Sequence, residues 1–127
     1  MTSAPILLVE DDVHVRGALA RVMRRRGAEI VTAGSAREAL EVLAEMRVQA
    51  IVADHHMPPG PTGVWLLEQV MHQHPEVRRL LFSGVDVPHA DELVRIGLVH
   101  TLLRKPVTGK EILAAIDGPG QAPAAER

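Results

Sequence analysis

Four stretches of the sequence carry groups that suit phosphate chemistry. Carboxylates stand at Glu10, Asp11 and Asp54, a hydroxyl at Ser83 and an amine at Lys105. Clustered carboxylates repel one another unless a cation compensates them. Oxygen ligands in a chain without cysteine favour a hard divalent ion, above all Mg²⁺, which keeps several of its waters. Together with a lysine and a hydroxyl, such a site would suit transfer of a phosphoryl group to a carboxylate.

Each of these groups follows a short apolar run. Continuous apolar runs bounded by Pro, Gly or charged residues are typical of buried strands. Patterns of apolar residues at i, i+3, i+4 and i+7 between the runs predict amphipathic helices. The expected strands are residues 5–9, 29–33, 50–53, 80–82 and 100–103, and the expected helices are residues 12–26, 36–44, 63–72, 90–96 and 108–116.

Five alternations of strand and helix predict an α/β fold, with a parallel sheet covered by helices on both faces. The carboxyl ends of parallel strands share one edge, so the polar groups should meet there. Asp12 is expected to cap the first helix, and Ser35 with Glu38 and Thr108 with Glu111 form predicted capping boxes.

Composition limits the alternatives. A chain of 127 residues with 46% hydrophobic content suits one domain, expected over residues 1–117, with residues 118–127 as a flexible tail or linker. A net charge of −2 argues against nucleic-acid binding. No apolar segment approaches the roughly 20 residues that span a bilayer, and no signal peptide is recognisable, so a cytoplasmic location is expected. Residues 24–26, three arginines, complement a helix dipole or form a docking surface for an acidic partner.

Four motifs in order resemble the receiver domain of two-component response regulators. They are residues 9–12 (VEDD), Asp54 with the Met-Pro pair at 57–58, residues 82–84 (FSG) and residues 103–106 (LRKP). The resemblance covers residues 5–116. It implies a doubly wound, flavodoxin-like sheet with strand order 2-1-3-4-5.

The resemblance also implies a Mg²⁺ site. Asp11 corresponds to the direct metal ligand, and Glu10 to the acid that acts through water. Asp54 and the main-chain carbonyl of His56 would complete the protein ligands.

By the same resemblance, Asp54 is the phospho-acceptor, which takes its phosphoryl group from a sensor histidine kinase or a phosphotransfer protein. Ser83 would hydrogen-bond the phosphoryl group and Lys105 would pair with its oxygens, aimed inward by a cis Lys105–Pro106 peptide. The added charge would reshape the loops after the fourth and fifth strands. The expected readout surface is the fourth helix, fifth strand and last helix.

Three features depart from the family pattern. Leu102 stands where many receivers have an aromatic residue that swings inward, so switching by a ring is not expected. The turn at residues 58–63 is one residue longer than usual, with three prolines. Residues 99–101 lack the acidic pair and aromatic of transcription-factor receivers, so dimerisation is possible but not predicted.

The adjacent His55 and His56 also suggest a transition-metal site, but side chains of neighbouring extended residues point apart. The favoured interpretation places His56 at the site entrance, modulating access of water. The other histidines are expected at the surface.

Two other functions compete with the signalling switch. A Mg²⁺-dependent phosphatase working through a phospho-aspartate would need a second acid two residues beyond the nucleophile, where His56 stands. A binding module that has lost phosphorylation is disfavoured by the presence of Asp11, Asp54, Ser83 and Lys105. The sequence has no recognisable output domain, so a stand-alone receiver and a piece of a longer regulator remain alternatives.

Overall fold

Within residues 4–117 the chain alternates five strands with five helices, as predicted. The computed structural model describes residues 4–117, and the tail expected at residues 118–127 lies outside this part. The elements are β1 (Ile6–Val9), α1 (Val13–Arg25), β2 (Ile30–Ala33), α2 (Ala36–Glu45), β3 (Ala50–Asp54), α3 (Gly63–Gln73), β4 (Arg78–Ser83), α4 (Ala90–Arg95), β5 (Thr101–Arg104) and α5 (Gly109–Asp117).

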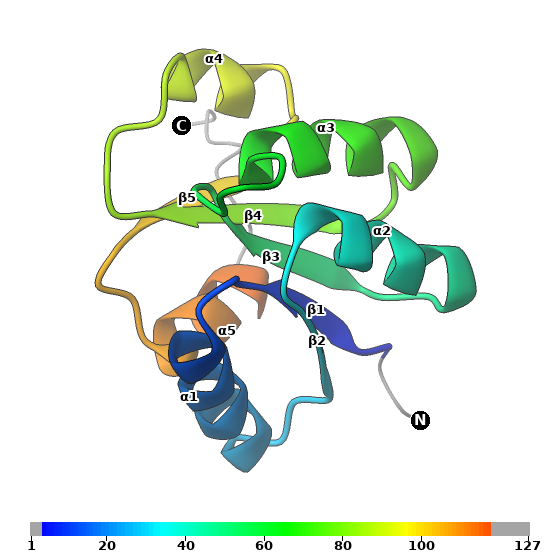
Figure 1. The fold of residues 1–127 in the computed structure, drawn as a ribbon, viewed down its shortest axis with the longest axis vertical. Helices are drawn as coiled ribbons and strands as arrows, with labels where there is room; N and C mark the ends of the chain where they lie inside the picture. The colour runs from blue at the N-terminus through cyan, green and yellow to red at the C-terminus, as the bar shows by residue number, and fades with distance from the viewer. Residues whose placement is uncertain (1–3, 118–127) are drawn as a thin grey trace.

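All neighbouring strands pair in parallel, in the order β2-β1-β3-β4-β5. Helices α1 and α5 cover one face of this sheet, and α2, α3 and α4 cover the other (Figure 1). The structure therefore confirms the predicted doubly wound fold, including its strand order. Such a sheet places ligand sites at the carboxyl ends of its strands, where the order of connection reverses.

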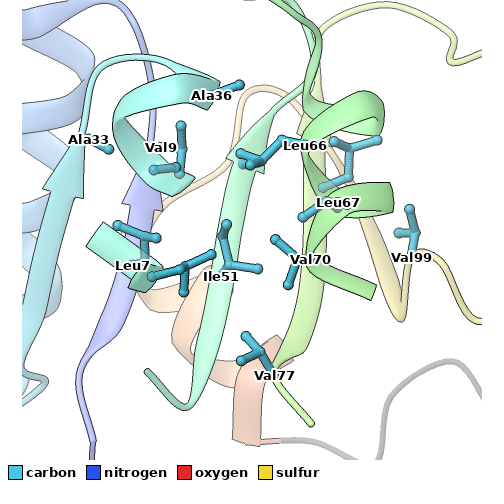
Figure 2. Packing of buried hydrophobic residues seen from close by; sticks show 14 of the residues in the cluster. Leu7, Val9, Ala33, Ala36, Ile51, Leu66, Leu67, Val70, Val77 and Val99 are labelled. Atoms are coloured by element: carbon cyan, nitrogen blue, oxygen red, sulfur yellow. The ribbon is translucent and has the colours of Figure 1, made fainter. Parts of the chain in front are cut away.

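Each face of the sheet has its own apolar layer. Successive strand residues point to opposite faces, so Leu7 joins the layer beneath α2 and α3, while Leu8 joins the layer beneath α1 and α5. Figure 2 shows the first layer, in which Ile51 from β3 packs near Leu66 and Val70 of α3. Burial on both faces explains why β1 and β3 are almost uninterrupted apolar runs.

The predicted helix caps form, with one difference. The Asp12 carboxylate accepts from the backbone N–H groups of His14 and Val15 at 2.9 and 3.1 Å. The capping box of α5 is complete, with both reciprocal bonds present at 2.9 and 3.0 Å. In the predicted box of α2, Ser35 accepts from Glu38 N–H, but the Glu38 carboxylate accepts from Gly34 N–H, one residue before the cap.

Strand β4 starts two residues earlier than predicted, because an arginine is buried in it. Arg79 is 4% exposed and its guanidinium bonds to main-chain carbonyls, so the strand extends through a charge that sequence patterns treat as a boundary. The expected surface position of His100 is wrong: its ring is half-buried and Nδ1 accepts from Arg79 N–H at 2.9 Å.

Gly63 allows the start of α3 to lie against the end of β3. A Cβ atom there would overlap the main-chain oxygen of Asp54 and lie 2.8 Å from Cδ1 of Leu81. We expect Gly63→Ala to lower the free energy of unfolding by about 3 kcal/mol, because the obstructing atom is backbone and cannot rotate away. A urea titration followed by the fluorescence of Trp65 measures the change.

Gly17→Ala is the matched control. Gly17 lies inside α1. Apart from its chain neighbours and the backbone of the helix itself, no described atom lies within 4 Å of the position that an added methyl group would take. Alanine there should raise the free energy of unfolding by about 0.5–1 kcal/mol, since glycine is a poor helix former. Equal effects at the two positions would contradict the steric role of Gly63.

Candidate functional site

The polar groups singled out from the sequence meet at one edge of the sheet. Glu10 and Asp11 follow β1, Asp54 ends β3, Ser83 ends β4 and Lys105 follows β5. All five line one open cleft at the carboxyl ends of the strands. Carboxylate oxygens of Glu10, Asp11 and Asp54 lie within 4.8 Å of one another. In the described part of the chain, this is the one group of three or more acids or histidines close enough to share a metal ion.

Lys105 links two of these acids. Its Nζ lies 3.3 Å from Oδ2 of Asp54 and 3.6 Å from Oε1 of Glu10. The amine also stands 5.2 Å from the centre of the Phe82 ring, which lies at the end of β4. The Lys105–Pro106 peptide is cis, as the resemblance implied. The ammonium group therefore compensates part of the negative charge at this edge.

Glu10 is the most buried acid of the cleft, with 1% of its surface exposed. Its Oε2 accepts from Asp12 N–H at 3.0 Å, whereas its Oε1 has no hydrogen-bond partner. Burial raises the pKa of Glu10 to about 7, and the Asp54 charge adds to this effect. The Asp12 N–H and Lys105 lower the pKa, but less than burial and the neighbouring acid raise it.

Ser83 is held by its own loop. Its Oγ donates to the carbonyl of Val85 at 2.7 Å and accepts from Val85 N–H at 3.2 Å. The hydroxyl lines the cleft, but its proton is directed to the main chain of the β4–α4 connection. A new oxygen acceptor in the cleft would compete with Val85 for that proton.

The two adjacent histidines have different surroundings. His56 is exposed and lines the cleft, whereas the half-buried His55 is not part of its lining. Burial lowers the pKa of His55, and its Nδ1 is enclosed without a hydrogen-bond partner. The group of three acids close enough to share a metal ion includes neither imidazole ring.

Two arginines with contacts near functional segments were not singled out from the sequence. Arg16 Nη1 donates to the carbonyl of Glu10 at 2.7 Å and so holds the end of β1 from the first turns of α1. The sequence could have indicated this contact, because a residue four positions after the helix cap Asp12 lies one turn on, on the same side of the helix as its start. Arg79, described above, lies at the opposite edge.

Leu102 is half-buried and packs against the apolar layer of α2 and α3.

Comparison with known proteins agrees with this geometry. The profile of the response regulator receiver domain matches residues 6–117. The response regulator protein FleR of Pseudomonas aeruginosa is 35% identical over 127 residues, covering 98% of this chain and 26% of its own length. The sensor kinase CckA of Brucella abortus is 38% identical over 86 residues, covering 65% of this chain and 9% of its own. The chain thus spans about a quarter or less of these relatives' lengths.

Solved structures give the same result. A response regulator protein from Burkholderia pseudomallei, described with a phosphorylated aspartic acid and a calcium ion, superposes with a TM-score of 0.84 at 25% identity. The match covers 98% of this chain and 72% of that one. A CheY-like receiver from Methanospirillum hungatei shares the fold, with a TM-score of 0.82 at 21% identity over 91% of each chain.

No helix within residues 4–117 is long and apolar enough to cross a membrane. The profile match extends over both β1 and α5, and the acids of β1 and β3 meet Lys105 at the sheet edge. The chain belongs to the response regulator receiver domain family, the phospho-accepting regulatory domain of two-component signalling.

Proposed function

We propose that Asp54 accepts a phosphoryl group from the phosphohistidine of a sensor histidine kinase or phosphotransfer protein. A carboxylate oxygen of Asp54 attacks phosphorus, an O–P bond forms, and the P–N bond breaks with its electron pair left on the imidazole of the donor. The observation that carries the proposal is the Lys105 ammonium 3.3 Å from Asp54, beside two further acids in an open cleft. The structural relative with a phosphorylated aspartic acid supports the same assignment.

The donor set fits Mg²⁺. The three clustered carboxylates are hard oxygen ligands. At Glu10, a raised pKa and a buried Oε1 without a hydrogen-bond partner mark a place where a further cation beside Lys105 would be stabilising. Asp11, Asp54 and the His56 carbonyl would hold the ion, with Glu10 acting through water. Bound there, Mg²⁺ would supply charge neutralisation for the phosphoryl oxygens.

The remaining cleft residues would respond to the new charge. The phosphoryl group brings additional negative charge and three acceptor oxygens. Lys105 would pair with them, and the Ser83 hydroxyl would leave the carbonyl of Val85 to donate to one of them. His56 at the cleft lining would limit the approach of the water that hydrolyses the acyl phosphate.

The proposed output is a change in the surface formed by α4, β5 and α5, read by an output domain or by a separate effector. Release of Val85 would alter the β4–α4 connection, which leads directly into α4.

We place the protein in the cytoplasm with its kinase and assign it no direct contact with nucleic acid.

We also propose that the chain is a switch and does not turn over a diffusible substrate. Incubation with Mg²⁺ and a small phosphodonor should add 80 Da once per chain, and inorganic phosphate released beyond one equivalent should appear only as slowly as the acyl phosphate decays. Rapid, sustained phosphate release with little phosphoprotein would favour the phosphatase interpretation.

A further inference from the structure

Arg79 lies at the end of β4 opposite the cleft, and it is buried. Its guanidinium donates to four main-chain carbonyls, at distances of 2.8 to 3.1 Å: those of Pro75, Val77, Gly97 and Leu98. None of the ion pairs within residues 4–117 includes Arg79. A buried guanidinium without a carboxylate is tolerated only when its donors are bonded, so these four contacts are needed together.

His100 completes the arrangement from β5. Its Nδ1 accepts from Arg79 N–H at 2.9 Å, and its own backbone N–H donates to the Arg79 carbonyl at 2.8 Å. Burial, and then the nearby charges of Arg79 and Arg78, lower the pKa of His100. A neutral ring keeps the Nδ1 lone pair free for this bond. We call Arg79 and His100, with the four carbonyls, the arginine clamp.

The arginine clamp fixes only one end of α4. Gly97 and Leu98, which follow this helix, are bonded both to Arg79 and back to the helix, through N–H donations to Val94 and Leu93 at 3.1 and 3.0 Å. Leu98 is also buried. The carboxyl end of α4 is therefore tied to β4 by hydrogen bonds and packing.

The amino end of α4 has weaker support: the connection before it contributes one buried residue, Val87, and an exposed ion pair between Asp86 and Arg104. Its cap residue, His89, has a left-handed backbone with φ of 60° and makes no side-chain capping bond. No residue of α4 is fully buried, and Gly84, Val85 and Asp86 in the preceding connection are exposed. This end connects, over six residues, to Ser83 in the cleft.

We propose that Arg79 is a positioning residue for the response to phosphorylation: the arginine clamp holds the carboxyl end of α4 and the start of β5 in place. Displacement that begins at Ser83 then moves the connection and the amino end of α4, and stops at Gly97. This inference rests on the proposed function of Asp54.

Amide hydrogen exchange, read by mass spectrometry with and without a small phosphodonor in Mg²⁺, tests the clamp. In the native protein, phosphorylation should change exchange by at least fivefold in residues 84–93 and by less than twofold in residues 96–101. In Arg79→Met, residues 96–101 should exchange at least tenfold faster before phosphorylation, and the phosphorylation-dependent change should spread into them.

Arg78→Met is the matched control. Arg78 is the neighbouring arginine, only half-buried, and its contact with the carbonyl of Ala115 is long at 3.4 Å. The Arg78→Met variant should show the native pattern of amide exchange in residues 84–101, with and without phosphorylation. A merely structural arginine would change the exchange rates without altering where the response to phosphorylation stops.

Two results would overturn the proposal: an equal response in residues 84–93 and 96–101 of the native protein, or a response in Arg79→Met as confined as the native one. If Arg79→Met does not fold, Arg79→Lys decides, because an ammonium has too few donors for four carbonyls. Residues 96–101 should then exchange two- to fivefold faster, and native rates would count against the clamp. Absence of the 80 Da addition in the native protein would refute the proposed function of Asp54. The exchange rates of residues 96–101 in the unphosphorylated native and variant proteins would still test whether the arginine clamp holds this segment.

Discussion

Replacing Lys105 with methionine should slow phosphorylation of Asp54 by about 10- to 100-fold. Methionine has a similar length but no charge, so the variant loses the ammonium that lies 3.3 Å from Asp54. The charge-assisted hydrogen bond that this ammonium would make to a phosphoryl oxygen should contribute about 1.5–3 kcal/mol, and each 1.4 kcal/mol of transition-state stabilisation is a factor of ten in rate. The initial rate of the 80 Da addition from a small phosphodonor, at saturating Mg²⁺, measures the effect.

Lys110→Met controls for a general loss of positive charge, since Lys110 is exposed on α5 and has no role in the cleft. Its phosphorylation rate should stay within twofold of the native rate. The Lys105 variant should still bind Mg²⁺, because the three acids remain and a competing cation is gone. A native rate in Lys105→Met would show that the amine takes no part in stabilising the phosphoryl oxygens.

Glu10→Gln should make the metal-free protein more stable at alkaline pH while weakening its Mg²⁺ binding at least tenfold. The folded-state pKa of Glu10 is raised from 4.5 to about 7. Between these two pH values the carboxyl group keeps its proton in the folded protein but has lost it in the unfolded chain. The stability that this proton provides is present below pH 4.5 and is lost as pH rises through 7. At pH 8 the charged Glu10 should cost about 3 kcal/mol, which glutamine removes.

Urea titrations in the presence of a chelator, at pH 5 and pH 8, test whether Glu10 destabilises the folded protein as pH rises. The gain of Glu10→Gln over the native protein should be larger at pH 8 than at pH 5, and titration calorimetry should show the loss of Mg²⁺ affinity. Glu41→Gln, an exposed substitution on α2, should change neither. A gain at pH 5 that equals or exceeds the gain at pH 8 would contradict the raised pKa.

The sequence predicted the features that repeat along the chain. Apolar runs and helical periodicity locate all five strands and helices, because a sheet buried on both faces needs continuous apolar strands. The convergence of Asp11, Asp54 and Lys105 follows in turn, since parallel strands place their carboxyl ends on one edge. These deductions need only the order of elements.

The sequence could not predict features that depend on distances between side chains. Nothing in the local pattern says that Glu10 is buried while Asp11 is exposed, because both follow the same strand. The burial of Arg79 depends on carbonyls that come from two connections on either side of β4 in the chain. His100 was expected at the surface because its partner in the fold, Arg79, is 21 residues away in sequence.

The most direct test of the central claim is to locate the phosphoryl group after incubation with a small phosphodonor and Mg²⁺. Tandem mass spectrometry of the protein, reduced with borohydride to trap the acyl phosphate, should identify Asp54 as the modified residue. Asp54→Asn should abolish the 80 Da addition, and Asp12→Asn, which retains a good helix cap at an exposed acid of the same edge, should preserve it. Modification at another residue, or undiminished phosphorylation of Asp54→Asn, would contradict the assignment of the cleft as a phospho-acceptor site.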